Sequence, residues 1–238
     1  MASPSFEVSC SWYDIKCDVE LDFAGKALYK EKLHPNIEAL LMLKEYLHDK
    51  CLFEQWTYLY VLHFNASLIC TLVRNYYTGR THWNEIIPNV YLGAIPLRYY
   101  NHGEQLKNLG IKRVISLVRE KEFTHSYFFT PDFDWIEKDI KQIILPAKDN
   151  EPLEYSHFVR GVEYILECIN NGLPVFAHCK GGVGRSASLI TALLVVLYKY
   201  SVEEALAFVV SKRPQTNLQS SQIAAVHGFV SKYKPLKV

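Results

Sequence analysis

One short stretch of the sequence organises the rest, VFAHCKGGVGRS at residues 175–186. Its apolar beginning ends at Cys179, and a segment with three glycines separates this cysteine from Arg185 and Ser186. A longer apolar segment follows, from Ala187 to Tyr198. Because a short apolar run bounded by glycines is typical of a buried strand and a longer run of a helix, the stretch predicts a strand, a tight loop and a helix.

The loop of residues 180–184, which we call the Cys179 loop, has the features of an anion-binding site. Its glycines allow backbone conformations that a side chain forbids, so successive N–H groups can converge on one point. The helix that follows adds the partial positive charge of its N-terminus there, and an arginine can place two N–H donors on one phosphate. The predicted anion-binding residues are Lys180, Gly181, Gly182, Val183, Gly184 and Arg185.

The position of Cys179 predicts a catalytic thiol. In this positive field the thiol should ionise more easily than a free one, and a thiolate beneath a bound phosphoryl group is a nucleophile aimed at phosphorus. Ser186 is placed to donate a hydrogen bond to the sulfur and to help it leave in a second step. His178 is predicted to hydrogen-bond nearby backbone and so to fix the setting of the cysteine. The alternative is a buried structural cysteine before a glycine turn.

These residues resemble a known signature. The motif His178-Cys179-x5-Arg185-Ser186 is similar to that of the cysteine-dependent protein tyrosine phosphatase superfamily. Two further motifs, WNEI at 83–86 and VYLGAIP at 90–96, resemble the opening of small dual-specificity phosphatases. Leu-Gly-Ala-x-Pro and the Cys-Lys start of the loop resemble in particular the mitochondrial-type phosphatidylglycerophosphate phosphatase group. The resemblance covers roughly residues 83–235 and implies phosphate monoester hydrolysis through a cysteinyl-phosphate intermediate.

The reaction also needs a general acid, because the leaving oxygen must be protonated as it departs. Asp149 is the first candidate: it follows a predicted strand and precedes a predicted helix, so it lies at the same end of the sheet as Cys179. The sequence KDNEP at 148–152 also resembles the acid loop of dual-specificity phosphatases. We expect no metal and no cofactor, because Arg185 and backbone N–H groups can hold the charge. The alternates for the acid are Asp132, Asp134, Glu151 and Glu154.

The hydrophobic pattern predicts an α/β fold with a central, mainly parallel sheet flanked by helices, as in dual-specificity phosphatases. The predicted strands are 90–93, 113–118, 143–146 and 174–177, with a shorter strand or turn at 134–139. The predicted helices are 103–109, 153–170, 187–200, 202–211 and 222–232. Ligands of such sheets bind beyond the carboxyl ends of the strands, where Cys179 lies.

The residues before this pattern are predicted to form a separate part of the chain. We expect a mostly helical N-terminal extension of unknown role at residues 1–82 and the catalytic domain at 83–238, with a break at TGRTH, 78–82. A helix is predicted from Pro35. Residues 55–73 carry no formal charge if His63 is neutral. Three interpretations stay open for that stretch: a packed helix, which its scattered polar residues favour, a contact with a membrane surface, or a membrane span.

Composition limits the other functions. Hydrophobic residues make up 49% and charged residues 21%, which is typical of a globular chain, and the net charge of +1 does not favour nucleic-acid binding. The six cysteines lack a Cys-x-x-Cys pair, so no zinc site is predicted. A nucleophilic thiol and the absence of a signal or transit peptide pattern indicate a reducing intracellular compartment, with the cytoplasm expected first. Cys168 is expected in the core, the alternative being a disulfide with Cys179.

The natural substrate stays open at this stage. Lys180 either faces an extra acidic group of the substrate or points to solvent. The substrate is therefore a phospholipid headgroup, phosphatidylglycerophosphate or a phosphoinositide, or a phosphorylated protein. The alternatives to a phosphatase are a non-catalytic phosphate-binding or scaffold protein with a phosphatase fold, or another thiol enzyme. Lys148 and Arg213 are expected on the solvated surface, the alternative being a positive rim around the site. No pattern in the sequence indicates an oligomeric state.

Overall fold

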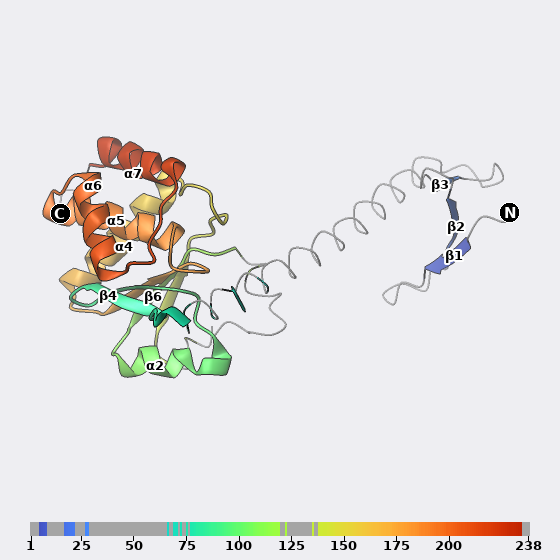
Figure 1. Cartoon of the computed structure of the whole chain (residues 1–238), viewed down its shortest axis with the longest axis horizontal. Helices are drawn as coiled ribbons and strands as arrows, with labels where there is room; N and C mark the ends of the chain where they lie inside the picture. Colours follow the sequence, from blue (N-terminus) through green and yellow to red (C-terminus); the bar gives the residue numbers. More distant parts are fainter. Residues whose placement is uncertain are drawn as a thin grey trace. The chain divides into compact units, whose positions relative to one another are not determined.

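The computed structural model describes residues 5–8, 17–21, 27, 28, 66, 69, 70, 72, 75, 77–119, 122, 135 and 138–234. The chain divides into two compact units, residues 1–55 and 56–238, each considered by itself (Figure 1). In the first unit, strands β1 (Ser5–Val8), β2 (Cys17–Leu21) and β3 (Ala27–Leu28) form an antiparallel sheet.

Several predictions on the N-terminal part fall outside the residues above. These are the helix from Pro35 and most of the stretch 55–73, so the mostly helical extension and its boundary at residue 82 stay predictions. No helix in the described part of the chain is long and apolar enough to cross a membrane.

The second unit contains a five-stranded sheet in the order β4-β5-β8-β6-β7. All neighbouring strands are parallel except β4 and β5, so the sheet is mainly parallel, as predicted. The strands are β4 (Trp83–Ile87), β5 (Val90–Gly93), β6 (Arg113–Ser116), β7 (Lys141–Ile144) and β8 (Val175–His178). Strand β4 was not predicted; it lies at the edge of the sheet, and a tight turn at Pro88 and Asn89 joins it to β5.

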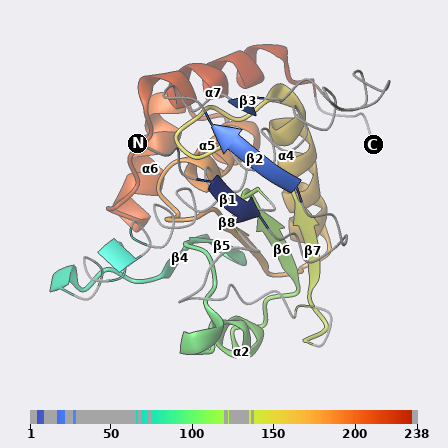
Figure 2. The ribbon, with the colours of Figure 1, turned by 90° about the vertical axis from the view of Figure 1, so that its right-hand side faces the viewer.

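Helices cover both faces of this sheet. Figures 1 and 2 show α2 (His102–Asn108) on one side and α4 to α7 on the other. Val175 and Ala177 of β8 pack in the large core on the α4–α7 side, whereas Phe176 packs in a smaller core with Leu106 and Trp135. Because side chains alternate across a strand, β8 is apolar on both faces, which explains its continuous apolar run. The large helices are α4 (Tyr155–Asn170), α5 (Arg185–Tyr198), α6 (Val202–Lys212) and α7 (Ser220–Lys232).

Helix α5 is the centre of the large core and holds the Cys179 loop that precedes it. Its residues are buried from Arg185 to Val195. The helix α4 approaches it closely at Gly161, where an added Cβ would lie 2.6 Å from a methyl carbon of Leu189. The buried hydroxyl of Thr191 donates to the carbonyl oxygen of Ala187 at 2.8 Å, so it does not disturb this packing. The first three turns of α5 are therefore buried, and α4 packs closely against them.

Candidate active site

The Cys179 loop leaves the sheet at its central strand. Gly93 of β5 and Ser116 of β6 lie beside His178 in the register of the sheet, so the carboxyl ends of three strands meet at Cys179. Gly182 has a φ of +64°, and a Cβ at this position would overlap the backbone of Gly93. Only glycine meets both conditions without strain. The tight loop predicted from the sequence is thus held against the end of β5.

The Cys179 thiol is buried and hydrogen-bonded. Its side chain is 2% exposed, and the Ser186 hydroxyl donates to Sγ at 3.2 Å. Burial alone would raise the pKa of this thiol, but the positive charge of Arg185 and the hydrogen bonds from Ser186 outweigh burial and hold the pKa below its usual value. The surroundings of Cys179 therefore favour the thiolate, the form of cysteine that reacts as a nucleophile.

Replacing Ser186 with Ala is expected to raise the pKa of Cys179, because the hydrogen bond from the Ser186 hydroxyl to the sulfur is lost. The thiolate fraction falls as the pH falls through the pKa, so the midpoint of thiolate reactivity should move to higher pH. The measurement is the pH dependence of iodoacetamide alkylation, followed by mass spectrometry on the peptide that contains Cys179. Ser188→Ala is the matched control, because that hydroxyl donates to the carbonyl of Gly184 instead. Identical midpoints in Ser186→Ala and the unmodified chain would contradict this assignment.

Arg185 is held by the carboxylate of Glu122, which was not among the predicted site residues. Its two terminal nitrogens donate to the two oxygens of Glu122 at 2.9 and 3.0 Å, and one of them also donates to the carbonyl of Ala147 at 2.8 Å. Burial lowers the pKa of Arg185, but the negative charges of Cys179, Glu122 and Asp149 outweigh it, so the pKa is raised overall. Glu122 lies on the segment that follows β6, at the same end of the sheet as Cys179. This position in the sequence could have indicated Glu122 as a site residue.

The guanidinium of Arg185 keeps one donor for a ligand. Its Nε is buried and lacks a hydrogen-bond partner within the part of the chain that the structure describes. A buried N–H without a partner is unfavourable, and an anion bound in the Cys179 loop would supply the acceptor. The bidentate pair with Glu122 fixes the plane of the guanidinium and therefore the direction of this free donor.

Asp149 contacts the loop directly. Its carboxylate lies 2.5 Å from the ammonium group of Lys180 and 3.1 Å from a terminal nitrogen of Arg185. Burial raises the pKa of Asp149, but Arg185 and Lys180 outweigh burial and lower the pKa overall. Of the alternates, Glu151 pairs with Lys148 at 3.3 Å and Glu154 accepts a hydrogen bond from Ser156, whereas Asp132 and Asp134 lie outside the described residues.

A chain of three hydrogen bonds fixes His178. Burial lowers the pKa of this histidine to about 3, so the ring is neutral. Nδ1 lies 3.2 Å from the carbonyl oxygen of Cys179 and must donate to it, which is the predicted backbone hydrogen bond. Nε2 then accepts from the Ser116 hydroxyl at 2.7 Å, and Ser116 in turn accepts from the amide of Gln142 at 2.7 Å. The main chain at the cysteine is thus tied to β6 and β7.

The expectation that Arg213 lies on the solvated surface is wrong. This side chain is 0% exposed and donates to the carbonyl oxygens of Gly182 and Gly181 at 2.8 and 3.2 Å and to Asn84 at 2.7 Å. Burial lowers its pKa to about 10. A basic residue at the end of a helix usually faces water, and the carbonyl acceptors that bury this one come from distant parts of the chain. Lys148 is exposed, as expected.

Cys168 behaves as a core residue. It is 2% exposed, and burial raises the pKa of its thiol to about 11. Cys168 and Cys179 are both free thiols, so the alternative of a disulfide between them is not realised.

This geometry defines a cysteine-dependent phosphatase, and the comparison with protein families agrees. The model of the dual specificity phosphatase catalytic domain matches residues 90–231, so the chain belongs to that family.

The chain is also similar to individual proteins of known activity or structure. The chain is 27% identical over 170 residues to the human phosphatidylglycerophosphatase and protein-tyrosine phosphatase 1, a match that covers 70% of this chain and 83% of that protein. It is 28% identical over 166 residues to the Arabidopsis thaliana phosphatidylglycerophosphate phosphatase PTPMT1, covering 68% of this chain and 47% of the relative. The crystal structure of PTPMT1 in complex with PI(5)P superposes with a TM-score of 0.58 at 25% identity, over 64% of this chain and 96% of that structure. The predicted family is thus confirmed, and the predicted resemblance to phosphatidylglycerophosphate phosphatases is found in these relatives.

Proposed function

We propose that this phosphatase removes the terminal phosphate from a phospholipid headgroup, with phosphatidylglycerophosphate as the first candidate and a phosphoinositide as the second. The observation that carries the proposal is the position of Lys180, whose ammonium group lies 2.5 Å from Asp149 beside the thiol loop. A second cation next to Arg185 suits a substrate that carries more negative charge than one phosphate monoester. The names of the two relatives above support the same choice.

The first half of the proposed reaction transfers the phosphoryl group to sulfur. The phosphate replaces the Asp149 carboxylate on Arg185 and accepts hydrogen bonds from that guanidinium and from the N–H groups of the Cys179 loop. The Cys179 thiolate then attacks phosphorus, the bond from phosphorus to the headgroup oxygen breaks, and Asp149 gives its proton to that oxygen. Asp149 can hold this proton because the bound phosphate offsets the cations that lower its pKa in the free enzyme.

The second half of the reaction releases phosphate. Water attacks the phosphorus of the cysteinyl phosphate, Asp149 takes a proton from the water, and the bond between sulfur and phosphorus breaks. The sulfur leaves as a thiolate, which the hydrogen bond from Ser186 stabilises. Arg185 and the loop N–H groups hold the charge of the phosphoryl group in both steps. His178 keeps the main chain at the cysteine in place and transfers no proton.

Asp149→Asn is expected to lower kcat by roughly 10²–10³-fold on an alkyl phosphate, the usual contribution of a general acid. The loss on p-nitrophenyl phosphate should be much smaller, because nitrophenolate leaves readily without a proton. The measurement compares kcat on glycerol 3-phosphate and on the aryl ester for each variant. The control is Asp139→Asn, whose carboxylate pairs with Lys112 and has an exposed fraction of 93%. A rate on the alkyl phosphate equal to that of the unmodified enzyme would move the acid role to another carboxyl group, with Glu151 next.

A substrate panel tests the proposed function itself. The purified chain is assayed for phosphate release from dispersed phosphatidylglycerophosphate, phosphoinositides and phosphotyrosine and phosphothreonine peptides. We expect the highest kcat/KM with phosphatidylglycerophosphate. A higher kcat/KM with phosphopeptides would overturn the lipid assignment, and binding without release of phosphate from any substrate would favour a non-catalytic phosphate-binding protein.

Two further proposals concern the setting of the enzyme. We propose that it works in a reducing intracellular compartment, because a reactive thiolate is readily oxidised elsewhere. We also propose residues 83–238 as the catalytic domain and residues 1–82 as an extension, whose last residues nevertheless take part in the cavity described next.

A further inference from the structure

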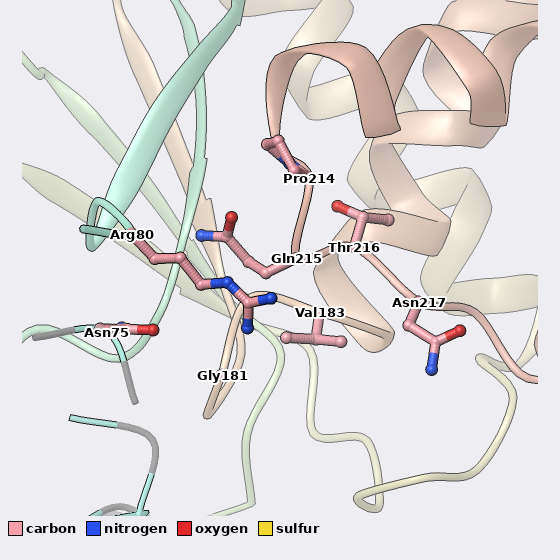
Figure 3. A pocket seen from close by; sticks show the side chains of 8 residues that line it. All are labelled: Asn75, Arg80, Gly181, Val183, Pro214, Gln215, Thr216 and Asn217. Carbon is pink, nitrogen blue, oxygen red and sulfur yellow. The ribbon is translucent and has the colours of Figure 1, made fainter. Parts of the chain in front are cut away.

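A cavity of about 400 Å³ lies beside the Cys179 loop. Figure 3 shows its lining, which comes from three places: the segment before β4, the Cys179 loop and the loop that follows α6. Gly181 and Val183 line the cavity and also belong to the predicted phosphate-binding loop. The cavity therefore adjoins the candidate active site, although Cys179 and Asp149 are not part of its wall.

Arg80 gives this cavity a positive charge. Figure 3 shows its side chain extended toward Val183, with the guanidinium inside the cavity. Among the residues that the structure describes, no carboxylate lines the cavity and none forms an ion pair with Arg80. The backbone N–H of Arg80 donates to the carbonyl oxygen of Asn75 at 3.0 Å, which anchors this residue at the cavity edge. A half-buried, unpaired guanidinium is a strong binding group for phosphate.

The opposite wall supplies polar groups on a fixed backbone. Thr216 is 7% exposed, and its hydroxyl has no hydrogen-bond partner in the described part of the chain. Buried hydroxyls rarely lack a partner, so a ligand or a bound water is expected there. The backbone N–H of Asn217 donates to the carbonyl oxygen of Val183 at 3.1 Å, and the Gln215 amide donates to the carbonyl oxygen of Thr81 at 3.2 Å. The cavity is thus tied both to the Cys179 loop and to the segment that carries Arg80.

We propose that this cavity is a second subsite, which binds the phosphodiester and polyol of a glycerophospholipid headgroup while its terminal phosphate lies at Cys179. The inference rests on the proposed function and assigns Arg80 to the second phosphate, and Thr216 and Asn217 to the polyol hydroxyls. In such headgroups a short polyol separates the two phosphates, which matches two anion sites that share one loop. A peptide is commonly held by an open strand edge or an apolar groove, and the residues that line this cavity come from loops and helix ends.

The test compares a substrate with two phosphates and a substrate with one. For each variant, kcat/KM is measured with water-soluble dihexanoyl phosphatidylglycerophosphate and with p-nitrophenyl phosphate, and the ratio of the two values is the readout. Arg80→Gln is expected to lower this ratio on the order of tenfold, mainly through KM, because an arginine–phosphate interaction is lost. Thr216→Val should lower the ratio by a smaller factor. Arg160→Gln is the matched control: it removes the same charge from an exposed position on α4 and should leave the ratio unchanged.

A second measurement tests the subsite independently of the proposed function. Propane-1,3-bisphosphonate and propylphosphonate are compared as inhibitors of p-nitrophenyl phosphate hydrolysis. The bisphosphonate should bind about tenfold more tightly, and Arg80→Gln should remove that advantage. A chain that does not hydrolyse the aryl phosphate contradicts the proposed function. A chain that does hydrolyse it but shows the same inhibition by both compounds, with and without Arg80, overturns the subsite alone. A selective loss on a doubly phosphorylated peptide would overturn the assignment of the cavity to a lipid headgroup.

Discussion

Cys179→Ser is expected to abolish the hydrolysis of p-nitrophenyl phosphate, with a fall in kcat on the order of 10⁴-fold or more, the loss typical of removing a nucleophile. A serine hydroxyl at this position has a much higher pKa than a thiol, so Arg185 and the hydrogen bonds from Ser186 cannot ionise it near neutral pH. The side chain is buried at 2% exposure, and serine is similar in volume, so the fold should be retained. The measurement is the steady-state release of nitrophenolate by purified protein.

Two controls make the Cys179→Ser result decisive. Far-UV circular dichroism and the melting temperature of the variant should match those of the unmodified chain, which separates loss of chemistry from loss of structure. Cys168→Ser changes a second buried free thiol of the catalytic domain's described residues, which lies in helix α4 and whose pKa burial raises to about 11. That variant should keep its phosphatase activity. Retained hydrolysis in purified Cys179→Ser would exclude the cysteinyl-phosphate mechanism.

Arg185→Lys is expected to lower kcat/KM for the same substrate by about 10³-fold, although the charge is kept. Lysine cannot donate to both oxygens of Glu122 as the arginine fork does, so this buried carboxylate loses one of its two hydrogen bonds to residue 185. It also cannot direct a separate donor, such as the free Nε of Arg185, at the bound phosphate. Both changes weaken the hydrogen bonds to the phosphoryl group, in the bound substrate and in the transition state. We therefore expect kcat to fall and KM to rise. Steady-state kinetics with phosphate as a competitive inhibitor measures both effects.

Glu122→Gln separates two contributions of Arg185 to kcat/KM: its bidentate pairing with Glu122 and its positive charge. The amide can still accept one hydrogen bond from Arg185, so the loss should be smaller than in Arg185→Lys. Arg113→Lys is the matched control, because that guanidinium donates to the carbonyl of Lys112 far from the thiol in the fold. Activity of Arg185→Lys within tenfold of the unmodified enzyme would show that a point charge is sufficient at this position.

Much of the fold was predictable because its strands and helices have clear hydrophobic patterns. The helices α4, α5, α6 and α7 begin and end within about two residues of their predicted bounds. The edge strand β4 was missed because its burial alternates poorly and Glu85 within it is exposed. Asp149 was predicted as the acid on two grounds: it follows a strand at the edge where Cys179 lies, and the sequence around it resembles the acid loop of dual-specificity phosphatases. Its carboxylate lies 3.1 Å from Arg185.

The residues that support the site were harder to predict. Glu122 and Arg185 lie 63 positions apart, and Arg213 lies 31 positions from the Gly182 carbonyl that it binds. No local period connects such partners, and both contacts form only when the loops around the sheet are assembled. Arg213 was expected at the surface because an arginine is seldom fully buried unless several acceptors surround it. The sequence around Arg213 does not indicate these acceptors.

The hydrogen bonds of Arg213 determine which way the peptide dipoles of the Cys179 loop are turned. Since the peptide unit is planar and trans, a carbonyl that points at Arg213 directs the N–H of the next residue to the opposite side. Arg213 holds the carbonyls of Gly181 and Gly182, so the N–H groups of Gly182 and Val183 face away from its guanidinium. Folding alone therefore orients part of the loop before any anion arrives. A cation buried behind the loop thus prepares a row of donors, and the binding of phosphate need not reorganise them.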